Sequence, residues 1–249
     1  MNIVNSKYTG THEYLNIMPI GDLHVGHKNY RESVAKKYLS QLCETTRGVL
    51  LGDLAECATK TSVGKGTFDT TMTPEEQRDY LIELLYPYRD YIDGGVSGTH
   101  EERLVKDTTW NIAKDVCRAI NVPFLNYSGF VKYAWNGVAY SIYIWHGSGH
   151  GTTAPAAIKT CEDIADRVFA DVYVMGHLHK LIKSDRIIFV PDQRNMKVQE
   201  VEQHFVVNGS CLAYDDGYAE MQGLTPRKLG FANIRLRGVK KEKEIKVTI

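Results

Sequence analysis

The stretch LNIMPIGDLHVGH, residues 15–27, places a short apolar run directly before a glycine and a polar segment. The run is rich in branched residues, as in a buried strand, and Gly21 marks its end. Four later runs are built in the same way: GVLL (48–51), DGGVS (93–97), YSIYIW (140–145) and DVYVM (171–175). We therefore expect strands that end in polar, glycine-containing loops.

Amphipathic stretches separate these runs and predict helices over residues 29–44, 74–91, 104–120 and 154–169. Strands that alternate with helices indicate an α/β fold. A second pattern is all-β: Asn136 and Gly137 between two apolar runs predict a hairpin. The last part of the chain offers further strands with little helix, RIIFV, QHFVVNG, GFANIRLR and EIKVTI. These patterns predict a mixed sheet, or two sheets packed face to face with helices outside.

Composition limits the class of protein. A chain of 249 residues with 43% hydrophobic content fits one domain, residues 1–249. Its formal net charge of zero argues against a protein that coats polyanions, although a local basic patch is compatible with it. Five cysteines without a C-x-x-C pair indicate a reduced, cytoplasmic protein. We see no signal peptide and no apolar run of about 20 residues, so we expect no membrane partner.

Histidines carry the chemical signal. Seven of the nine lie just past the ends of predicted strands, in glycine-rich loops. Ligands collect at the carboxyl ends of strands in open α/β sheets, so these loops are expected to converge on one site. The seven are His24, His27, His100, His146, His150, His177 and His179.

Two of the segments carry a pair of polar residues two apart. Asp22 and His24 share this spacing, as do His177 and His179, so in an extended chain each pair points to one side and can chelate a cation. A surface turn with incidental polar residues is the alternative. Five such strand-end segments, which offer oxygen and imidazole ligands without thiolates, together predict a metal site.

Asp53 and His146 have structural alternatives of their own. Asp53 directly follows the run GVLL and a glycine, where an aspartate also serves to cap a helix. His146 follows an aromatic strand, where a lone histidine is commonly a hydrogen-bonded core residue.

Five segments, taken in order, resemble the five signature segments of the calcineurin-like metallophosphoesterases. They are GDLHVGH, LGDLAE, GTHEE, WHG and GHLH. They span residues 21–179. The resemblance implies a four-layer αββα sandwich, two mixed β-sheets flanked by helices. GDLHVG is also similar to the first segment of double-strand-break-repair nucleases of this superfamily, and the chain has the general look of bacteriophage-encoded members.

The resemblance also implies two divalent transition metals, manganese first, with iron, zinc or nickel as alternatives. It implies that His100 contacts the phosphate or protonates the leaving group, and that Glu101 is of lesser chemical importance. Asp53 would bridge the metals. The metal ligands implied are Asp22, His24 and His179 for the first ion, and His146 and His177 for the second.

Such a site suits a phosphodiester, whose negative charge repels hydroxide. Two cations about 3.5 to 4 Å apart clamp the phosphoryl oxygens and lower the pKa of a bridging water, so that a metal-bridging hydroxide becomes the nucleophile. Imidazole ligands favour transition metals over magnesium or calcium. A proton donated by His100 to the leaving oxygen is typically worth about 10² to 10⁴ in rate.

Two positions depart from the family pattern. Thr99 stands where the family has asparagine, and a hydroxyl is a poorer ligand than an amide carbonyl. The second metal is therefore expected to be weaker, to take water there, or to recruit another residue. Glu56 replaces the family's later aspartate as a candidate catalytic residue that orients His100. A solvent-facing first-turn glutamate is the alternative.

Four residues are candidate substrate contacts. They are Thr99, His27, Lys60 and Lys65. The two lysines lie in the long polar loop of residues 57–74, which has the length of a functional lid. A flexible solvated loop is the alternative for the lysines, and a structural or solvent-exposed role is the alternative for His27.

The leading hypothesis is a phosphoesterase that hydrolyses a phosphodiester, with nucleic acid and nucleotides among its candidate substrates. A phosphomonoesterase or protein phosphatase is the second hypothesis. A non-catalytic binding scaffold on the same fold is the third, and Thr99 is the residue that favours it. The oligomeric state does not follow from the sequence.

Overall fold

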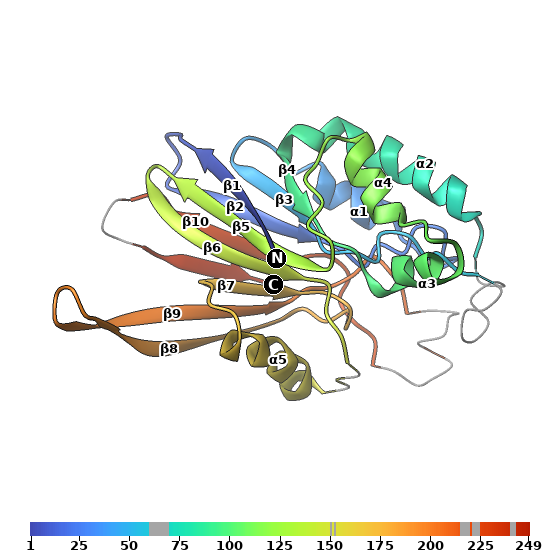
Figure 1. Ribbon diagram of the computed structural model, residues 1–249. Coiled ribbons are helices and arrows are strands. Elements are labelled where there is room, and N and C mark those ends of the chain that lie inside the picture. Colours follow the sequence, from blue (N-terminus) through green and yellow to red (C-terminus); the bar gives the residue numbers. More distant parts are fainter. Residues whose placement is uncertain (60–69, 150, 152, 215–219, 221–224, 240–242) are drawn as a thin grey trace.

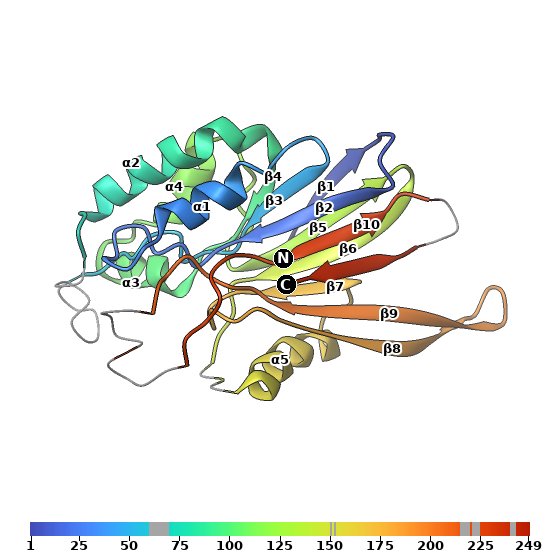
Figure 2. The same ribbon diagram turned by 180° about the vertical axis from the view of Figure 1, so that it is seen from behind.

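The computed structural model describes residues 1–59, 70–149, 151, 153–214, 220, 225–239 and 243–249. Two sheets pack face to face, as Figures 1 and 2 show from opposite sides. One sheet contains, in spatial order, β1 (Asn2–Tyr8), β5 (Ser128–Trp135), β6 (Val138–Trp145), β7 (Val172–Met175), β9 (Lys197–Val207) and β8 (Ile182–Asp192). The other contains β11 (Ile245–Thr248), β10 (Asn233–Arg237), β2 (Tyr14–Ile20), β3 (Thr46–Leu50) and β4 (Ile92–Gly95).

Both sheets are mixed. In the first, β6 pairs in parallel with β7 and antiparallel with β5. In the second, β2 pairs in parallel with β3 and antiparallel with β10. The parallel strands β2, β3 and β4 are buried along most of their length because both of their faces are covered.

Helices cover the outer faces of the two sheets. Figure 1 shows α1 (Glu32–Leu39), α2 (Pro74–Leu85), α3 (Thr99–Thr108) and α4 (Ile112–Ala119) on the side of β2 to β4, and α5 (Ala154–Glu162) on the side of β8 and β9. The inner core joins residues such as Leu15 and Val49 to Ile142 and Val174 across the two sheets. Separate apolar clusters lie under each helical layer. The expected αββα sandwich is therefore confirmed.

The predicted helix over residues 104–120 is wrong in its bounds. Two helices replace it, α3 and α4, because Thr109 adopts a left-handed conformation with φ of 64° and ends α3. α3 begins at Thr99, so His100 lies in the first turn of a helix rather than in a loop. This start fixes the direction in which His100 enters the site.

Other element bounds also differ from the expectations. α1 ends at Leu39, and the ends of the other two predicted helices are the 3₁₀ turns η1 (Tyr86–Tyr91) and η2 (Asp163–Asp166). β1, which has a mostly polar sequence, was not predicted. The hairpin between β5 and β6 is confirmed, with positive φ at Asn136 (49°) and Gly137 (85°) as a type I′ turn requires. Within the described part of the chain, every helix is too short or too polar to span a bilayer.

Candidate metal centre

The five predicted segments meet where five strands end. β2, β3 and β4 of one sheet and β6 and β7 of the other lead into them. Three groups of side chains there each place their ligand atoms within 4.8 Å of one another. The groups are Asp22, His24 and His179; Asp53, His146 and His177; and His24, Glu56 and His100.

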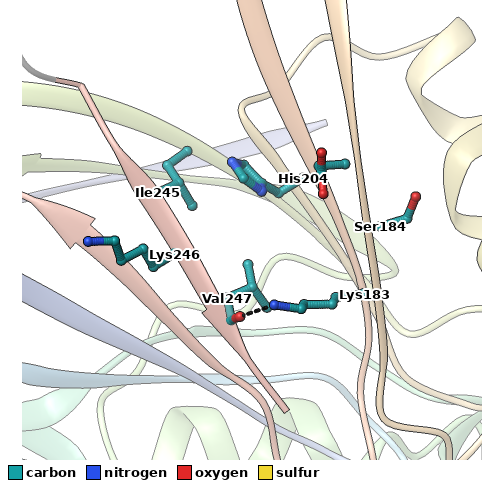
Figure 3. A pocket seen from close by; sticks show the side chains of 7 residues that line it. Lys183, Ser184, His204, Ile245, Lys246 and Val247 are labelled. Carbon is teal, nitrogen blue, oxygen red and sulfur yellow. Dashed lines mark hydrogen bonds between the residues drawn. The ribbon is translucent and has the colours of Figure 1, made fainter.

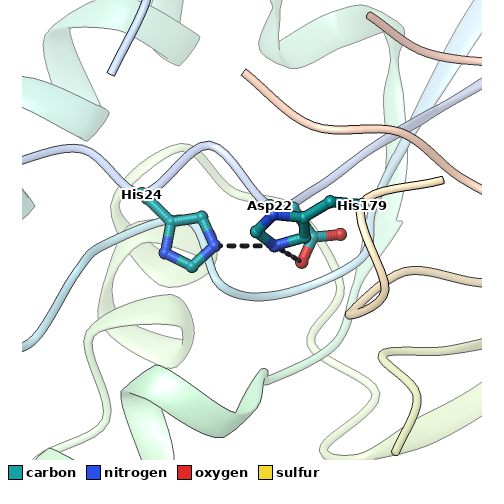
Figure 4. A group of neighbouring side chains, drawn as sticks. All are labelled: Asp22, His24 and His179. Atoms are coloured by element: carbon teal, nitrogen blue, oxygen red, sulfur yellow. Dashed lines mark hydrogen bonds and ion pairs between the residues drawn. The ribbon is translucent and has the colours of Figure 1, made fainter. Parts of the chain in front are cut away.

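The first group joins Asp22 and His24, which follow β2, to His179, which follows β7 (Figure 4). Nε2 of His24 is 3.1 Å from Nε2 of His179, and Nε2 of His179 is 3.3 Å from Oδ1 of Asp22. Asp22 is fully buried. Burial opposes its ionisation, but the charge of His179 lowers the pKa of Asp22 on balance. A buried carboxylate between imidazoles is thereby kept anionic, as a metal ligand must be.

The second group is built around Asp53 at the end of β3. Nε2 of His146 lies 3.1 Å from Oδ2 of Asp53 and is buried without a hydrogen-bond partner among the described residues. Nδ1 of His146 donates to the carbonyl of Leu51 at 2.7 Å, which directs Nε2 towards Asp53. Nε2 of His177 contacts the carbonyl of Gly149 at 3.2 Å, so Nδ1 is the nitrogen that remains for a cation.

Proton affinities in this group follow from Asp53. Burial disfavours a charged imidazole, but the negative charge of Asp53 raises the pKa of His146 to about 10. Burial likewise opposes the ionisation of Asp53, yet the charges of His100 and His146 hold its pKa well below the usual range. Without a cation, protons on the histidines balance the buried carboxylate.

The backbone of the site is strained. Asp22, His24, Asp53, His177 and His179 all have positive φ, between 45° and 67°. Aspartate and histidine are among the few non-glycine residues enriched in this region. Each such residue costs on the order of 1 kcal/mol or more, and such strain persists where the surrounding structure enforces it, often at functional sites.

Glu101 provides part of that enforcement. Its buried carboxylate accepts hydrogen bonds from four backbone N–H groups, those of Asp53 (2.9 Å), Leu54 (2.7 Å), Ala55 (3.3 Å) and Gly98 (2.9 Å). A Cβ on Gly98 would lie 2.1 Å from N of Asp53, so glycine is needed for this approach. Glu101, which was expected to be of lesser chemical importance, thus has a structural role. At position N3 of α3, Glu101 accepts from the backbone N–H of the N-cap residue Gly98, which is the glutamate half of a capping box.

Glu56 lies between two histidines. Its Oε2 is 3.0 Å from Nδ1 of His24 and 3.4 Å from Nδ1 of His100, and its carbonyl accepts a hydrogen bond from Nδ1 of His100 at 2.9 Å. With 5% of its surface exposed, Glu56 does not face solvent, so that alternative is wrong. Burial opposes ionisation, but the hydrogen bond from His100 lowers the pKa of Glu56 on balance. Glu56 is placed to orient His100.

His100 and His24 respond differently to these surroundings. Burial opposes a charged imidazole, but Asp53 and the hydrogen bond to Glu56 raise the pKa of His100 to about 9. Burial and the charge of His100 lower the pKa of His24 to about 4. At neutral pH His100 is therefore the protonated imidazole of the pair, and His24 is the neutral one.

The candidate substrate contacts are only partly described. Thr99 donates from its hydroxyl to Oδ2 of Asp53 at 3.1 Å, and N of His100 donates to Oδ1 of the same carboxylate at 2.7 Å. Nδ1 of His27 accepts a hydrogen bond from N of Asn29 at 3.0 Å, and His27 belongs to none of the three groups. Lys60, Lys65 and also His150 lie outside the described residues.

These donors fit divalent transition metals. Carboxylate oxygens and imidazole nitrogens converge, and two Nε2 atoms face each other at 3.1 Å, a contact in which one nitrogen at most can donate. A cation bound by both nitrogens would account for their approach. Thiols are absent from all three groups.

A pocket of about 220 Å³ lies elsewhere, between β8, β9 and β11 (Figure 3). Its lining includes His204, Lys183 and Lys246, and Lys183 donates to the carbonyl of Val247 at 2.8 Å across it. None of the predicted metal ligands lines this pocket.

Five segments in the family's order thus meet at the strand ends of an αββα sandwich. This is the arrangement that the resemblance to the calcineurin-like metallophosphoesterases implies. No protein-family model matches the chain, and no curated protein matches it in sequence.

Solved structures with a similar chain path include Vacuolar Protein Sorting 29 from Cryptosporidium parvum, at 17% identity and a TM-score of 0.48, with 95% of this chain and 98% of that chain covered. Vps29 from Entamoeba histolytica complexed with Zn²⁺ is 15% identical, with a TM-score of 0.41 and 94% and 98% covered. A predicted phosphoesterase from Streptococcus pneumoniae is 13% identical, with a TM-score of 0.41 and 96% and 100% covered. At these values the likeness is one of chain path and says nothing of activity.

Proposed function

We propose that the chain is a metallophosphoesterase of one domain, residues 1–249, that hydrolyses a phosphodiester. The observation that carries the proposal is that two groups of candidate metal ligands lie beside His100, the candidate proton donor. The groups are Asp22, His24 and His179, and Asp53, His146 and His177. Two divalent cations, manganese in the first place, with iron, zinc or nickel as alternatives, would neutralise the phosphate there and supply a hydroxide nucleophile near neutral pH.

Side chains of this protein account for the other requirements. Asp53 has its two oxygens directed apart: Oδ1 accepts from N of His100, and Oδ2 faces His146. Oδ2 is thereby the Asp53 oxygen that would hold a cation together with His146 and His177. Nδ1 of His100 is held by the carbonyl of Glu56, so Nε2, which lies 3.8 Å from Oδ2 of Asp53, is the nitrogen that faces the centre. We assign to this Nε2 the proton for the leaving oxygen.

Thr99 favours a second candidate, a binding scaffold that retains the fold without turnover. Its hydroxyl donates to Oδ2 of Asp53 and so competes with a cation for that oxygen. The retained His100 and its hydrogen bond to Glu56 favour catalysis, because a scaffold has no use for an oriented proton donor.

The test begins with metal analysis of the purified protein, followed by chelation and manganese return. We expect at least one transition metal per chain, loss of bis(p-nitrophenyl) phosphate hydrolysis on chelation, and recovery with manganese. Activity on p-nitrophenyl phosphate, which has the same leaving group, separates a diesterase from a monoesterase. Assays with single-stranded DNA, duplex DNA and RNA then identify the class of the natural substrate.

His100→Ala and His12→Ala form a matched pair for this test, because His12 is an exposed histidine outside the site. Only the first should lose turnover. Full activity of the metal-free protein would contradict the proposal, and bound metal without turnover on any of these esters would support the scaffold.

A further inference from the structure

Arg103 lies one helical turn after His100 on α3, and the contact between the two is not a true hydrogen bond. Nη1 of Arg103 is 3.4 Å from Nδ1 of His100. That nitrogen lies 2.9 Å from the carbonyl of Glu56, which can only accept, so Nδ1 carries the hydrogen. Guanidinium groups only donate. Two donors therefore face each other, and Arg103 lacks an acceptor at this contact.

Arg103 also has no carboxylate partner among the residues that the structure describes. The acidic residues next to it are committed elsewhere: Glu101 to backbone N–H groups, and Glu102 to Ser97 and Asn111 at 3.2 and 3.3 Å. The side chain is only half-buried, so a ligand can reach it. An unpaired guanidinium of this kind is suited to bind a planar or tetrahedral oxyanion in bidentate fashion.

The position of Arg103 indicates which anion it would bind. Nε2 of His100 faces Asp53 and the ligand groups, whereas Arg103 contacts the opposite nitrogen of the ring, Nδ1. A scissile diester has only two non-bridging oxygens, and cations held by the ligand groups would take up both. Arg103 therefore lies on the far side of the His100 ring from the ligand groups, next to the residue that would protonate the leaving oxygen.

We infer that Arg103 binds a second anionic group, carried by the leaving portion of the substrate. The inference rests on the proposed function, since it takes His100 as the donor to the leaving oxygen. It narrows the substrate to phosphodiesters whose leaving group bears another phosphate, as in an oligonucleotide or a nucleotide bisphosphate.

A calorimetric titration without turnover tests this role. Thymidine 3′,5′-bisphosphate and thymidine 5′-phosphate are titrated into the manganese-loaded protein and its variants. Arg103→Ala should lower the affinity for the bisphosphate by roughly 10-fold to 100-fold, because the second phosphate loses a charge-assisted contact. The affinity for the monophosphate should stay within about 3-fold of the wild-type value. Arg103→Lys should retain part of the affinity. Lys106→Ala removes an exposed cation from the same helix and should change neither.

Turnover supplies a second measurement. Arg103→Ala should lower kcat/KM for an oligothymidylate at least 10-fold more than it lowers kcat/KM for bis(p-nitrophenyl) phosphate, mainly through KM. Equal bisphosphate affinity in the wild type and Arg103→Ala would overturn the inference, as would an equal loss on both substrates. A wild type that binds metal but hydrolyses neither ester would instead refute the proposed function, and the titration would still decide the role of Arg103.

Discussion

Replacement of Glu101 by glutamine tests how the Asp53 loop is held. Each carboxylate oxygen of Glu101 accepts from two backbone N–H groups: Oε2 from Asp53 and Gly98, and Oε1 from Leu54 and Ala55. An amide keeps one acceptor and turns the other into a donor. Two buried N–H groups then face an NH₂ group, whichever way the amide is oriented.

The magnitude follows from the number of unsatisfied groups. A buried donor without an acceptor costs about 1 to 3 kcal/mol, so two cost about 2 to 6 kcal/mol. Burial and the neighbouring charge of Asp53 raise the pKa of Glu101, which means that the wild-type carboxylate is itself destabilised. Glutamine removes that penalty, so we expect the free energy of unfolding to fall by about 2 to 4 kcal/mol, the lower half of this range. The free energy of unfolding of a native protein is typically about 5 to 15 kcal/mol.

Urea unfolding of the metal-free protein, followed by circular dichroism, measures this loss as a lower midpoint at constant slope. Glu83→Gln on the exposed face of α2 is the control and should change the free energy of unfolding by less than about 0.5 kcal/mol. If Glu101→Gln unfolds within that same margin of the wild type, the four hydrogen bonds do not hold the loop and the reasoning is refuted.

Three further predictions concern the metal centre. His100→Ala should lower turnover by about 10² to 10⁴ while the metal content is unchanged; elemental analysis showing lost metal would mean that His100 is a ligand. Thr99→Asn should tighten the weaker metal site, because it removes the hydroxyl bonded to Asp53 and supplies an amide carbonyl; identical manganese isotherms would rule this out. Metal affinity should rise with pH between 6 and 9, because the pKa of His146, raised to about 10, keeps a proton on the metal-free site that a cation must displace. Calorimetry in buffers of different ionisation enthalpy should detect the released proton, and a flat pH dependence would contradict the assignment of His146.

Local sequence patterns were sufficient to predict an α/β protein and the convergence of the ligand segments, whereas the αββα sandwich was implied by the resemblance to the calcineurin-like metallophosphoesterases. Each polar segment follows a run apolar enough to be a buried strand, and the carboxyl ends of such strands share one edge. Asp22 and His24 therefore lie with His179 although 155 positions separate His24 from His179. The spacing of two within each pair was the informative signal.

Other features depend on contacts that the sequence does not reveal. No glycine or proline interrupts residues 104–120, and the break at Thr109 is a conformation that a β-branched residue adopts only when its surroundings impose it. β1 is polar along most of its length and forms a strand because β5 offers it a parallel edge. The bonds of Glu101 to the loop after β3 join residues about 47 positions apart.

The left-handed backbone at Asp22, His24, Asp53, His177 and His179 also limits how this centre can change during evolution. A substitution there alters the local conformational energy as well as the ligand, so exchange for another metal-binding side chain such as glutamate or cysteine is disfavoured twice. Glycine and asparagine relieve the strain while abolishing or weakening the ligand. A lineage that lost the activity but kept the fold would therefore carry glycine or asparagine at these five positions. Those substitutions would mark where the metal ligands had been.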